Sequence, residues 1–229
     1  MGIAERKARE KQIRSDQILE SAYQVFQQVG YTAATMDQIA ERAELAKGTL
    51  YIYFKSKEEV YFSLLINGLD ILINLLEEAE ASGKMRENPL QETAKTLFLY
   101  YTEYTHYFRI FMVMRQEDMQ AKLTPDLSAE INKRATSILN LLVCQVQRMI
   151  PEDASTQINP WHVANLLWGA FIGITQLALA KEQLKARATQ NDDLLCLCFD
   201  LIGRGLLSTG TELTKPGKRL QSAKGKRNV

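Results

Sequence analysis

Residues 47–57, KGTLYIYFKSK, interleave lysine, threonine and tyrosine side chains with one leucine and one phenylalanine. At about 100° per residue in a helix, Leu50 and Phe54 lie together on one face and the polar side chains lie around the others. Lysine and tyrosine side chains bind DNA phosphates, and threonine or isoleucine side chains can contact base edges. Tyrosines on a solvent face have no packing role, so the pattern predicts a DNA-binding helix. Its predicted contacts are Lys47, Gly48, Thr49, Tyr51, Ile52 and Tyr53.

A second short helix is predicted just before this one and would position it. Thr35 can cap its start, and Gln38, three residues later, completes a capping box that satisfies orphan backbone donors. With a turn at residues 44–46, the two helices form a helix-turn-helix pattern, whose second helix enters the major groove of DNA. Similar helix pairs occur in proteins that never bind DNA, but here the polar face exceeds what packing requires. The apolar face of the first helix consists of Met36, Ile39, Ala40 and Ala43.

The segment KGTLYIYFKSKEE at residues 47–59, with Gly-Tyr at 30–31 and Thr35 upstream, resembles the TetR/AcrR family of one-component transcriptional regulators. The resemblance is specific over roughly residues 13–62 and only architectural beyond them. It implies that Lys47, Thr49, Tyr51 and Tyr53 contact the groove or its phosphates. It also implies that Lys57 contacts a phosphate from the start of the following helix. We include Thr35 among the predicted DNA contacts.

Two positions depart from the family pattern. Glu44 stands where the family often has a turn glycine, and Ala46 stands where it often has a serine or threonine cap. The loss of a hydroxyl cap typically costs about 1 kcal/mol of helix stability, which does not abolish the motif. The detailed geometry of the turn is the feature that these two residues affect.

The charge distribution fits a DNA-binding head on a separate body. The chain has 229 residues and a net charge of only +1, which at first argues against a nucleic-acid partner. Lysine and arginine outnumber the acids by nine to seven in residues 1–57 and by six to none in residues 215–229, whereas acids outnumber them by 20 to 13 in residues 58–214. Basic ends can neutralise DNA phosphates, and an acidic body avoids non-specific adsorption.

Helical periodicity continues through the rest of the chain, and we predict an all-α fold. A three-helix head with an N-terminal arm is expected over residues 1–56, a helical ligand-binding and dimerisation domain over 57–214, and a disordered basic tail over 215–229. The expected helices after the helix-turn-helix start near Lys57, Pro89, Phe108, Pro125, Pro160 and Asp192, and a helix from about Ser15 to Val29 precedes it.

Catalytic, metal and membrane signatures are weak in this sequence. The two histidines, His106 and His162, fall in different predicted helices, and the three cysteines have no zinc-ligand spacing, so we expect neither an enzyme nor a metal or other cofactor. The N-terminus has no secretory signal, which predicts a cytoplasmic protein. The apolar stretch 163–180 is interrupted by polar residues, and we interpret it as a buried helix with no membrane partner.

Aromatic and methionine side chains in the body are candidates to line an apolar ligand cavity, because such side chains adapt to bulky ligands. Any helical bundle also needs such residues in its core, and the sequence leaves both interpretations open. The candidate ligand-binding residues are Tyr101, Tyr104, Phe108, Phe111, Met112, Met119, Trp168, Phe171 and Gln176.

Gly169 and Gly173 lie one helical turn apart and thin one helix face, so that another backbone can approach. In the TetR family the last two long helices form a four-helix dimer interface, which here implies residues 160–188 and 192–209. We therefore predict a dimer contact that includes Trp168, Gly169 and Gly173, with intramolecular packing of the two glycines as the alternative.

The sequence thus predicts a homodimeric transcriptional regulator. It would act as a repressor that binds a palindromic double-stranded DNA operator and is released by a small, largely apolar ligand. The alternative is a helical protein that binds nucleic acid or an anionic membrane non-specifically through its basic ends.

Overall fold

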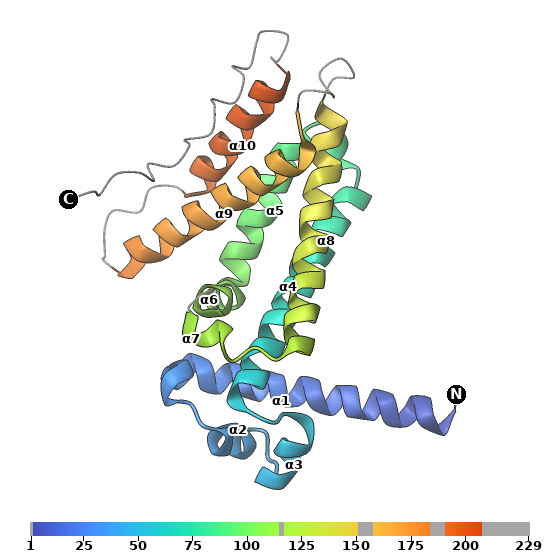
Figure 1. Ribbon diagram of the computed structural model, residues 1–229, viewed down its shortest axis with the longest axis vertical. Coiled ribbons are helices and arrows are strands. Elements are labelled where there is room, and N and C mark those ends of the chain that lie inside the picture. Colours follow the sequence, from blue (N-terminus) through green and yellow to red (C-terminus); the bar gives the residue numbers. More distant parts are fainter. Residues whose placement is uncertain (1, 115–116, 151–157, 184–190, 208–229) are drawn as a thin grey trace, which may run out of the picture.

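The computed structural model describes residues 2–114, 117–150, 158–183 and 191–207, and all regular elements within these ranges are helices (Figure 1). The predicted all-α fold is confirmed. The predicted tail at 215–229 and the predicted end of a helix near residue 188 lie outside the described residues. The elements are α1 (Ile3–Ala33), α2 (Met36–Arg42), α3 (Lys47–Tyr53), α4 (Lys57–Ala81), η1 (Lys84–Arg86), α5 (Pro89–Glu103), α6 (Thr105–Met114), α7 (Glu117–Gln120), α8 (Pro125–Met149), α9 (Pro160–Gln183) and α10 (Asn191–Leu207).

The head consists of the second half of α1 with α2 and α3, below the body in Figure 1. Ile18, Ile39 and Leu50 are fully buried between these three helices. The backbone N–H of Gln38 donates to Thr35 Oγ1 over 3.2 Å, and the N–H of Thr35 donates to Gln38 Oε1 over 2.9 Å. This is the predicted capping box, and it fixes the start of α2.

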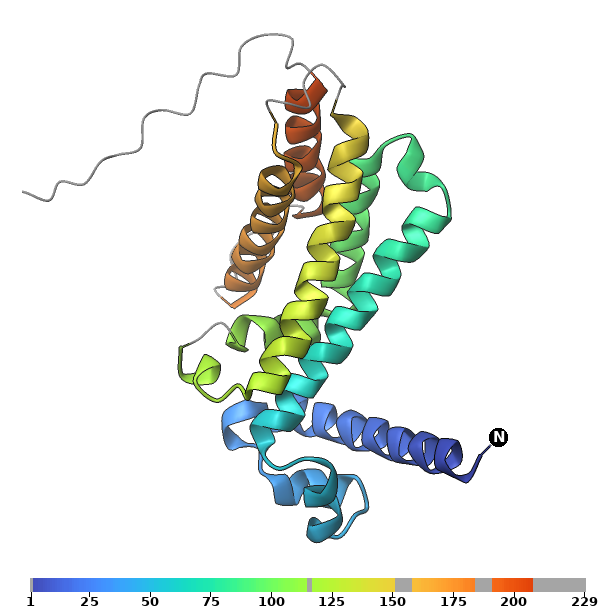
Figure 2. The ribbon, with the colours of Figure 1, turned by 45° about the vertical axis from the view of Figure 1, so that its right-hand side comes forward.

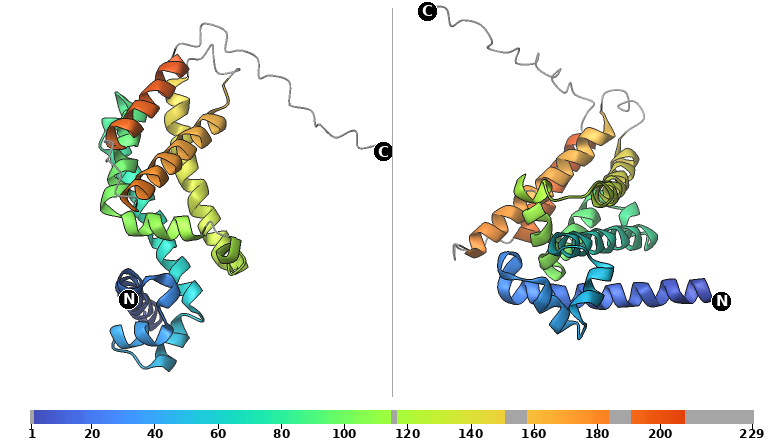
Figure 3. Two further views of the ribbon diagram at one scale, coloured as in Figure 1. Left: turned by 90° about the vertical axis from the view of Figure 1, so that its left-hand side faces the viewer. Right: turned by 60° about the horizontal axis from the view of Figure 1, so that its bottom comes forward.

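Helix α1 is longer than its apolar pattern predicted. We expected a start near Ser15, but the helix begins at Ile3, and residues 4–14 are all exposed. This extension projects beyond the rest of the chain (Figure 3). Near its other end, Gly30 has φ +76°, so α1 changes direction there and one further turn leads to Ala33.

Helix α4 runs from the head into the body, where it packs against α5 and α8 (Figure 2). Ser56 caps it by accepting a hydrogen bond from the N–H of Glu59 over 3.1 Å. The helix ends at Ala81, directly before the Ser82-Gly83 pair. Leu65 and Leu72 are fully buried, so α4 forms the centre of the body core.

Helix α6 crosses α4 at very short range. A Cβ atom added to Gly68 would lie 2.5 Å from Tyr107 Cβ, so only glycine fits at this crossing. The sequence did not identify this contact, nor the short elements η1 and α7. The crossing holds α6 against α4, and the contact between the rings of Phe108 and Phe171 joins α6 to α9.

Candidate functional site

Helix α3 presents the face that its residue spacing predicted. Leu50 is fully buried and Phe54 is 5% exposed, whereas Ile52 is 68% exposed and Tyr51 is 38% exposed. Gly48 is exposed as well, and no atom lies within 4 Å of where its Cβ would stand, so another molecule's backbone can approach closely. Exposing an isoleucine on a seven-residue helix has no benefit for folding, which favours a binding role for this face.

The two departures from the family pattern are visible in the turn before α3. Glu44 adopts the left-handed conformation, with φ +55°, which glycine tolerates better than other residues. Ala46 is the N-cap residue of α3, and no side chain there accepts a hydrogen bond from the first turn. The turn therefore keeps the expected path, and both residues reduce its stability.

Lys47 lies at the start of α3 and forms an ion pair with Asp37 of α2, with 2.6 Å between Nζ and Oδ1. The hydrogen bond from Lys47 to this carboxylate raises the pKa of the lysine. Both side chains are more than half exposed, so the pair stabilises the fold little and the ammonium can move to a phosphate.

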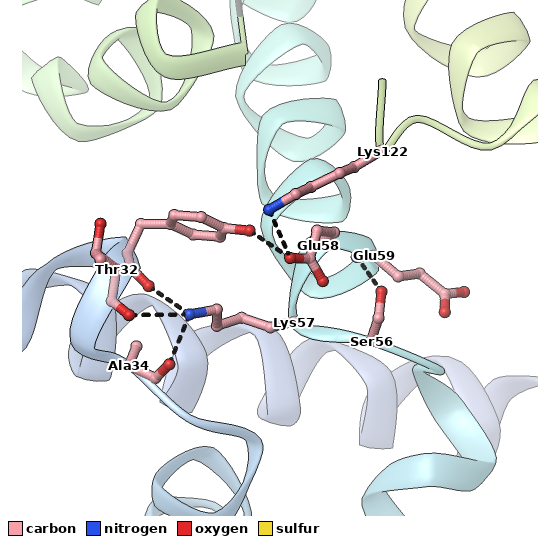
Figure 4. A network of polar contacts seen from close by, with 8 residues as sticks. Thr32, Ala34, Ser56, Lys57, Glu58, Glu59 and Lys122 are labelled. Atoms are coloured by element: carbon pink, nitrogen blue, oxygen red, sulfur yellow. Dashed lines mark hydrogen bonds and ion pairs between the residues drawn. The ribbon is translucent and has the colours of Figure 1, made fainter. Parts of the chain in front are cut away.

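Lys57 is the first residue of α4, as predicted, and its ammonium is bound within the chain (Figure 4). Its Nζ donates to the backbone carbonyls of Tyr31, Thr32 and Ala34, at 2.8, 3.3 and 2.8 Å. The same ammonium lies 4.6 Å from the centroid of the Tyr31 ring. These three carbonyls use all three donors of the lysine. In this conformation Lys57 joins the end of α1 to the start of α4, and a phosphate contact would require it to release a carbonyl.

Glu58, the next residue, links the head to the body (Figure 4). It accepts a hydrogen bond from Tyr31 Oη over 2.8 Å and pairs with Lys122, from the segment between α7 and α8, over 3.3 Å. Burial raises the pKa of Glu58, but the hydrogen bonds from Tyr31 and Lys122 outweigh it and leave the pKa below its ordinary value. No local sequence pattern indicates this joint, because Glu58 and Lys122 are 64 residues apart.

Five of the predicted ligand-binding residues form one contiguous aromatic cluster in the body. Phe108 lies 5.7 Å from Tyr101, 6.2 Å from Phe111 and 5.6 Å from Phe171, measured between ring centroids. Trp168 lies 6.3 Å from Phe111 and 5.4 Å from Phe171. The cluster therefore joins α5, α6 and α9. Tyr101, Phe108 and Phe171 are at most 5% exposed, so these rings pack as core in this conformation.

The remaining ligand candidates lie at or beyond the edges of this cluster. Tyr104 stacks on Tyr100 at 5.9 Å, Met119 is buried on α7, and Met112 is half-buried on α6. Gln176 is exposed, which corrects its prediction as the polar group of an apolar cavity. The preceding residue, Thr175, is 2% exposed and donates to the carbonyl of Phe171 over 2.7 Å. One residue corresponds to about 100° of helix rotation, so sequence position alone did not decide between the two.

Helices α9 and α10 lie side by side on one flank of the body (Figures 1 and 2). Both helices expose apolar side chains. Gly169 and Gly173 are exposed, and no atom lies within 4 Å of a Cβ built on either, so neither glycine serves an intramolecular crossing among the described residues. Trp168 differs from them, because its ring joins the aromatic cluster. The exposed apolar side chains are Trp161, Leu166 and Leu177 on α9 and Leu194, Leu197 and Leu201 on α10.

By length and composition alone, α4 and α9 could each cross a membrane. The most apolar window of α4 is 50% buried in the fold, and that of α9 is 33% buried. The low figure for α9 reflects the same exposed apolar face, which leaves a large surface available to a partner.

A cleft of about 900 Å³ opens between α1 and α6, where the head meets the body. The rings of His106 and Tyr23 bridge these helices with centroids 4.2 Å apart. Burial lowers the pKa of His106 below its ordinary value, which favours the neutral imidazole. Helix α6 thus contacts the head through one face and the aromatic cluster through another.

A family model described as bacterial regulatory proteins of the tetR family matches residues 18–64, which cover the head and the start of α4. Residues 18–64 form a TetR-family DNA-binding domain. The chain is 27% identical over 161 residues to the uncharacterized regulator YhgD of Bacillus subtilis, a match that covers 70% of this chain and 82% of that protein. It is also 27% identical over 134 residues to the fatty acid metabolism regulator protein of the same organism, covering 58% of this chain and 66% of that one.

Among solved structures, the fold resembles FadR from Bacillus subtilis in complex with stearoyl-CoA, with a TM-score of 0.56 and 21% identity over 84% of this chain and 97% of that one. The TetR-family relatives are DNA-binding transcriptional regulators, and so is this chain. The expectation that it is not an enzyme is confirmed by these relatives.

Proposed function

We propose that the chain is a cytoplasmic repressor that binds a palindromic operator as a homodimer and leaves it when an apolar ligand enters the body. The observation that carries the DNA-reading part is the outward face of α3. Ile52 stands 68% exposed at its centre, flanked by Tyr51 and the open backbone at Gly48. We assign Thr49 and Ile52 to base edges, and Lys47, Tyr51 and Tyr53 to the groove walls and phosphates.

The dimer forms through the apolar flank of α9 and α10. Leucine side chains such as Leu197 and Leu201, 52% and 60% exposed, would be buried by a second copy. The glycine pair at Gly169 and Gly173 lets the two copies of α9 cross closely. Two-fold symmetry then places two α3 helices in successive major grooves, about one DNA turn or a multiple apart, which requires a palindromic site.

The ligand enters the aromatic cluster between α6 and α9. Support comes from the predicted residues that meet there and from the similar fold of a FadR protein that was solved with stearoyl-CoA. We propose a fatty acyl thioester as the ligand class. Because Phe108, Phe111 and Phe171 pack on one another, an acyl chain must push α6 away from α9 to enter.

Movement of α6 is transmitted to the head by two contacts. Tyr107 fits against Gly68 of α4, and His106 stacks on Tyr23 of α1. A shift of α6 therefore changes how α4 and α1 hold α3. A ligand can shift this equilibrium only by its differential affinity for the two states, typically 1–3 kcal/mol, or about 5–150-fold in operator affinity.

The DNA-binding part is tested by selecting bound fragments from the source genome and footprinting the recovered sites. We expect a discrete palindrome with two protected half-sites. Binding of every polyanion with similar affinity, anionic vesicles included, would instead support the non-specific alternative.

The ligand part is tested separately with acyl-CoA thioesters of increasing chain length and with free CoA as the control. Long chains should raise the melting temperature and weaken operator affinity together, and free CoA should do neither. The ligand assignment fails if none of the thioesters changes operator affinity, and the DNA-binding proposal is not affected by that result.

A further inference from the structure

The N-terminal extension of α1 has no packing function that explains it. From Ala4 to Arg14 every residue is exposed, including Ile13, which is 49% exposed. Isolated helices of this length are marginal in water, and most helical stability in proteins comes from packing. An exposed helical extension of this kind is therefore better explained by a partner that it contacts.

One face of the extension is basic and is turned toward the DNA-reading helix. Lys7, Lys11 and Arg14 are spaced four and three residues apart, which places them on the same side of the helix. All three line a groove of about 620 Å³ together with Tyr53, the last residue of α3. The groove thus connects the basic face to the same recognition helix, although the two are some forty residues apart in sequence.

The other lining residues do not cancel this charge. Gln17 and Ile13 are neutral, and Glu10 is the only acid among the residues that line the groove. Its carboxylate is paired with Arg6, with 3.2 Å between Arg6 Nε and Glu10 Oε1. The lining of the groove therefore carries an excess of positive charge.

We propose that this groove binds the DNA sugar-phosphate backbone beside the half-site that α3 reads. Lys7, Lys11 and Arg14 would contact successive phosphates, and the hydroxyl of Tyr53 would donate to the same strand. From Lys7 to Arg14 the helix rises roughly 10 Å, about three base-pair steps along the duplex. The inference rests on the proposed DNA binding and adds a second contact surface that reads no bases.

Such contacts add affinity that does not depend on sequence and is sensitive to salt. Each neutralised phosphate contributes about 0.9 to the slope of log affinity against log salt concentration on duplex DNA. Loss of Lys7 and Lys11 should therefore reduce this slope by roughly 1.8 and leave the preference among operator variants unchanged.

The test compares two double variants of equal charge. Lys7→Gln/Lys11→Gln removes two groove cations. Arg9→Gln/Lys84→Gln removes two cations that do not line the groove, one from the same extension and one from the body, and it keeps Arg6, which pairs with Glu10. Glutamine keeps the helix propensity close to that of lysine and arginine, and circular dichroism checks the helix content. Operator affinity is measured at several salt concentrations for the full-length protein and both variants.

We expect the slope of log affinity against log salt concentration to become smaller in the groove variant and to stay unchanged in the control variant. Equal loss in both variants would show a general effect of charge and would overturn the proposal, as would an unchanged slope in both. If the unaltered protein binds no selected fragment, the proposed function itself fails, and this result is distinguishable because it precedes any comparison of variants.

Discussion

The reading head and the aromatic cluster of the body use large side chains in opposite ways. On α3, Ile52 and Tyr51 are exposed although nothing in the fold requires them there, whereas Phe108 and Phe171 in the body are almost completely buried. A change on α3 should therefore alter binding without altering stability. A change in the cluster should alter stability first, and function only through the packing of α6.

The largest effect is expected at the apolar flank of α9 and α10, through which two copies of the chain would bring their two heads to one operator. Leu201→Glu places a charge in the proposed dimer contact and should weaken operator affinity by at least about 100-fold, because the avidity of two linked half-sites is lost. Leu99→Glu, on an exposed leucine of α5, is the matched control and should keep both dimer and affinity. Sedimentation of both variants shows whether the dimer is lost. If the Leu201→Glu protein is still a dimer, the dimer interface does not lie at Leu201.

The next effect separates the two regions by stability. Phe108→Ala removes a ring that is 2% exposed and should lower the free energy of unfolding by about 3–5 kcal/mol. Ile52→Ala should change it by less than about 0.5 kcal/mol, because the side chain is mostly in solvent. Urea unfolding measures both. Equal losses in the two variants would mean that Ile52 is part of a packed core and would remove the argument for its role in DNA binding.

A smaller effect distinguishes residues within α3. Ile52→Asn should change the difference in binding free energy between bases at one position of the half-site by about 1–3 kcal/mol. Tyr53→Phe should weaken binding to all DNA sequences alike. Dissociation constants on a panel of operator variants and on unrelated DNA measure this difference. If Ile52→Asn lowers the affinity for all DNA sequences equally, the Ile52 side chain contacts the DNA backbone and not a base.

The turn before α3 offers a gain in stability. Ala46→Ser supplies an N-cap acceptor and should stabilise the protein by about 1 kcal/mol, seen as a higher melting temperature. Ala43→Ser, at the C-cap of α2, gives the control, since a hydroxyl there caps no helix start. If both substitutions have the same effect, the cap geometry at Ala46 is not the cause.

The smallest effect concerns the joint at Glu58. Its pKa is below the ordinary value in the folded state, so its contribution to stability is complete above the unfolded pKa and is lost as the pH falls through the folded pKa. Glu58→Gln should therefore lower stability at pH 7 and make it less dependent on pH below about 4.5. Thermal unfolding from pH 3 to 7 measures this, and parallel curves for the two proteins would exclude a role for the carboxylate.

The sequence predicted the head far better than the body, and the reason is physical. The capping box at Thr35 and the orientation of Leu50 and Ile52 depend on neighbours within one or two turns, which local spacing reports directly. The Glu58–Lys122 pair and the Gly68–Tyr107 crossing depend on residues about 40 to 64 positions apart, for which the sequence has no local signal. Gln176 is an intermediate case: its helix was predicted correctly, but the side of the helix that faces the core was not, because Thr175 is buried there and Gln176 is exposed.

The central claim is that the exposed face of α3 reads a specific sequence. The most direct measurement is the ratio of dissociation constants for the selected operator and for a scrambled duplex of equal length, at one salt concentration near 0.15 M. The account predicts that the unaltered dimer binds the operator at least about 1,000-fold more tightly. A ratio near one would contradict it and leave only attraction between the basic ends of the chain and any polyanion.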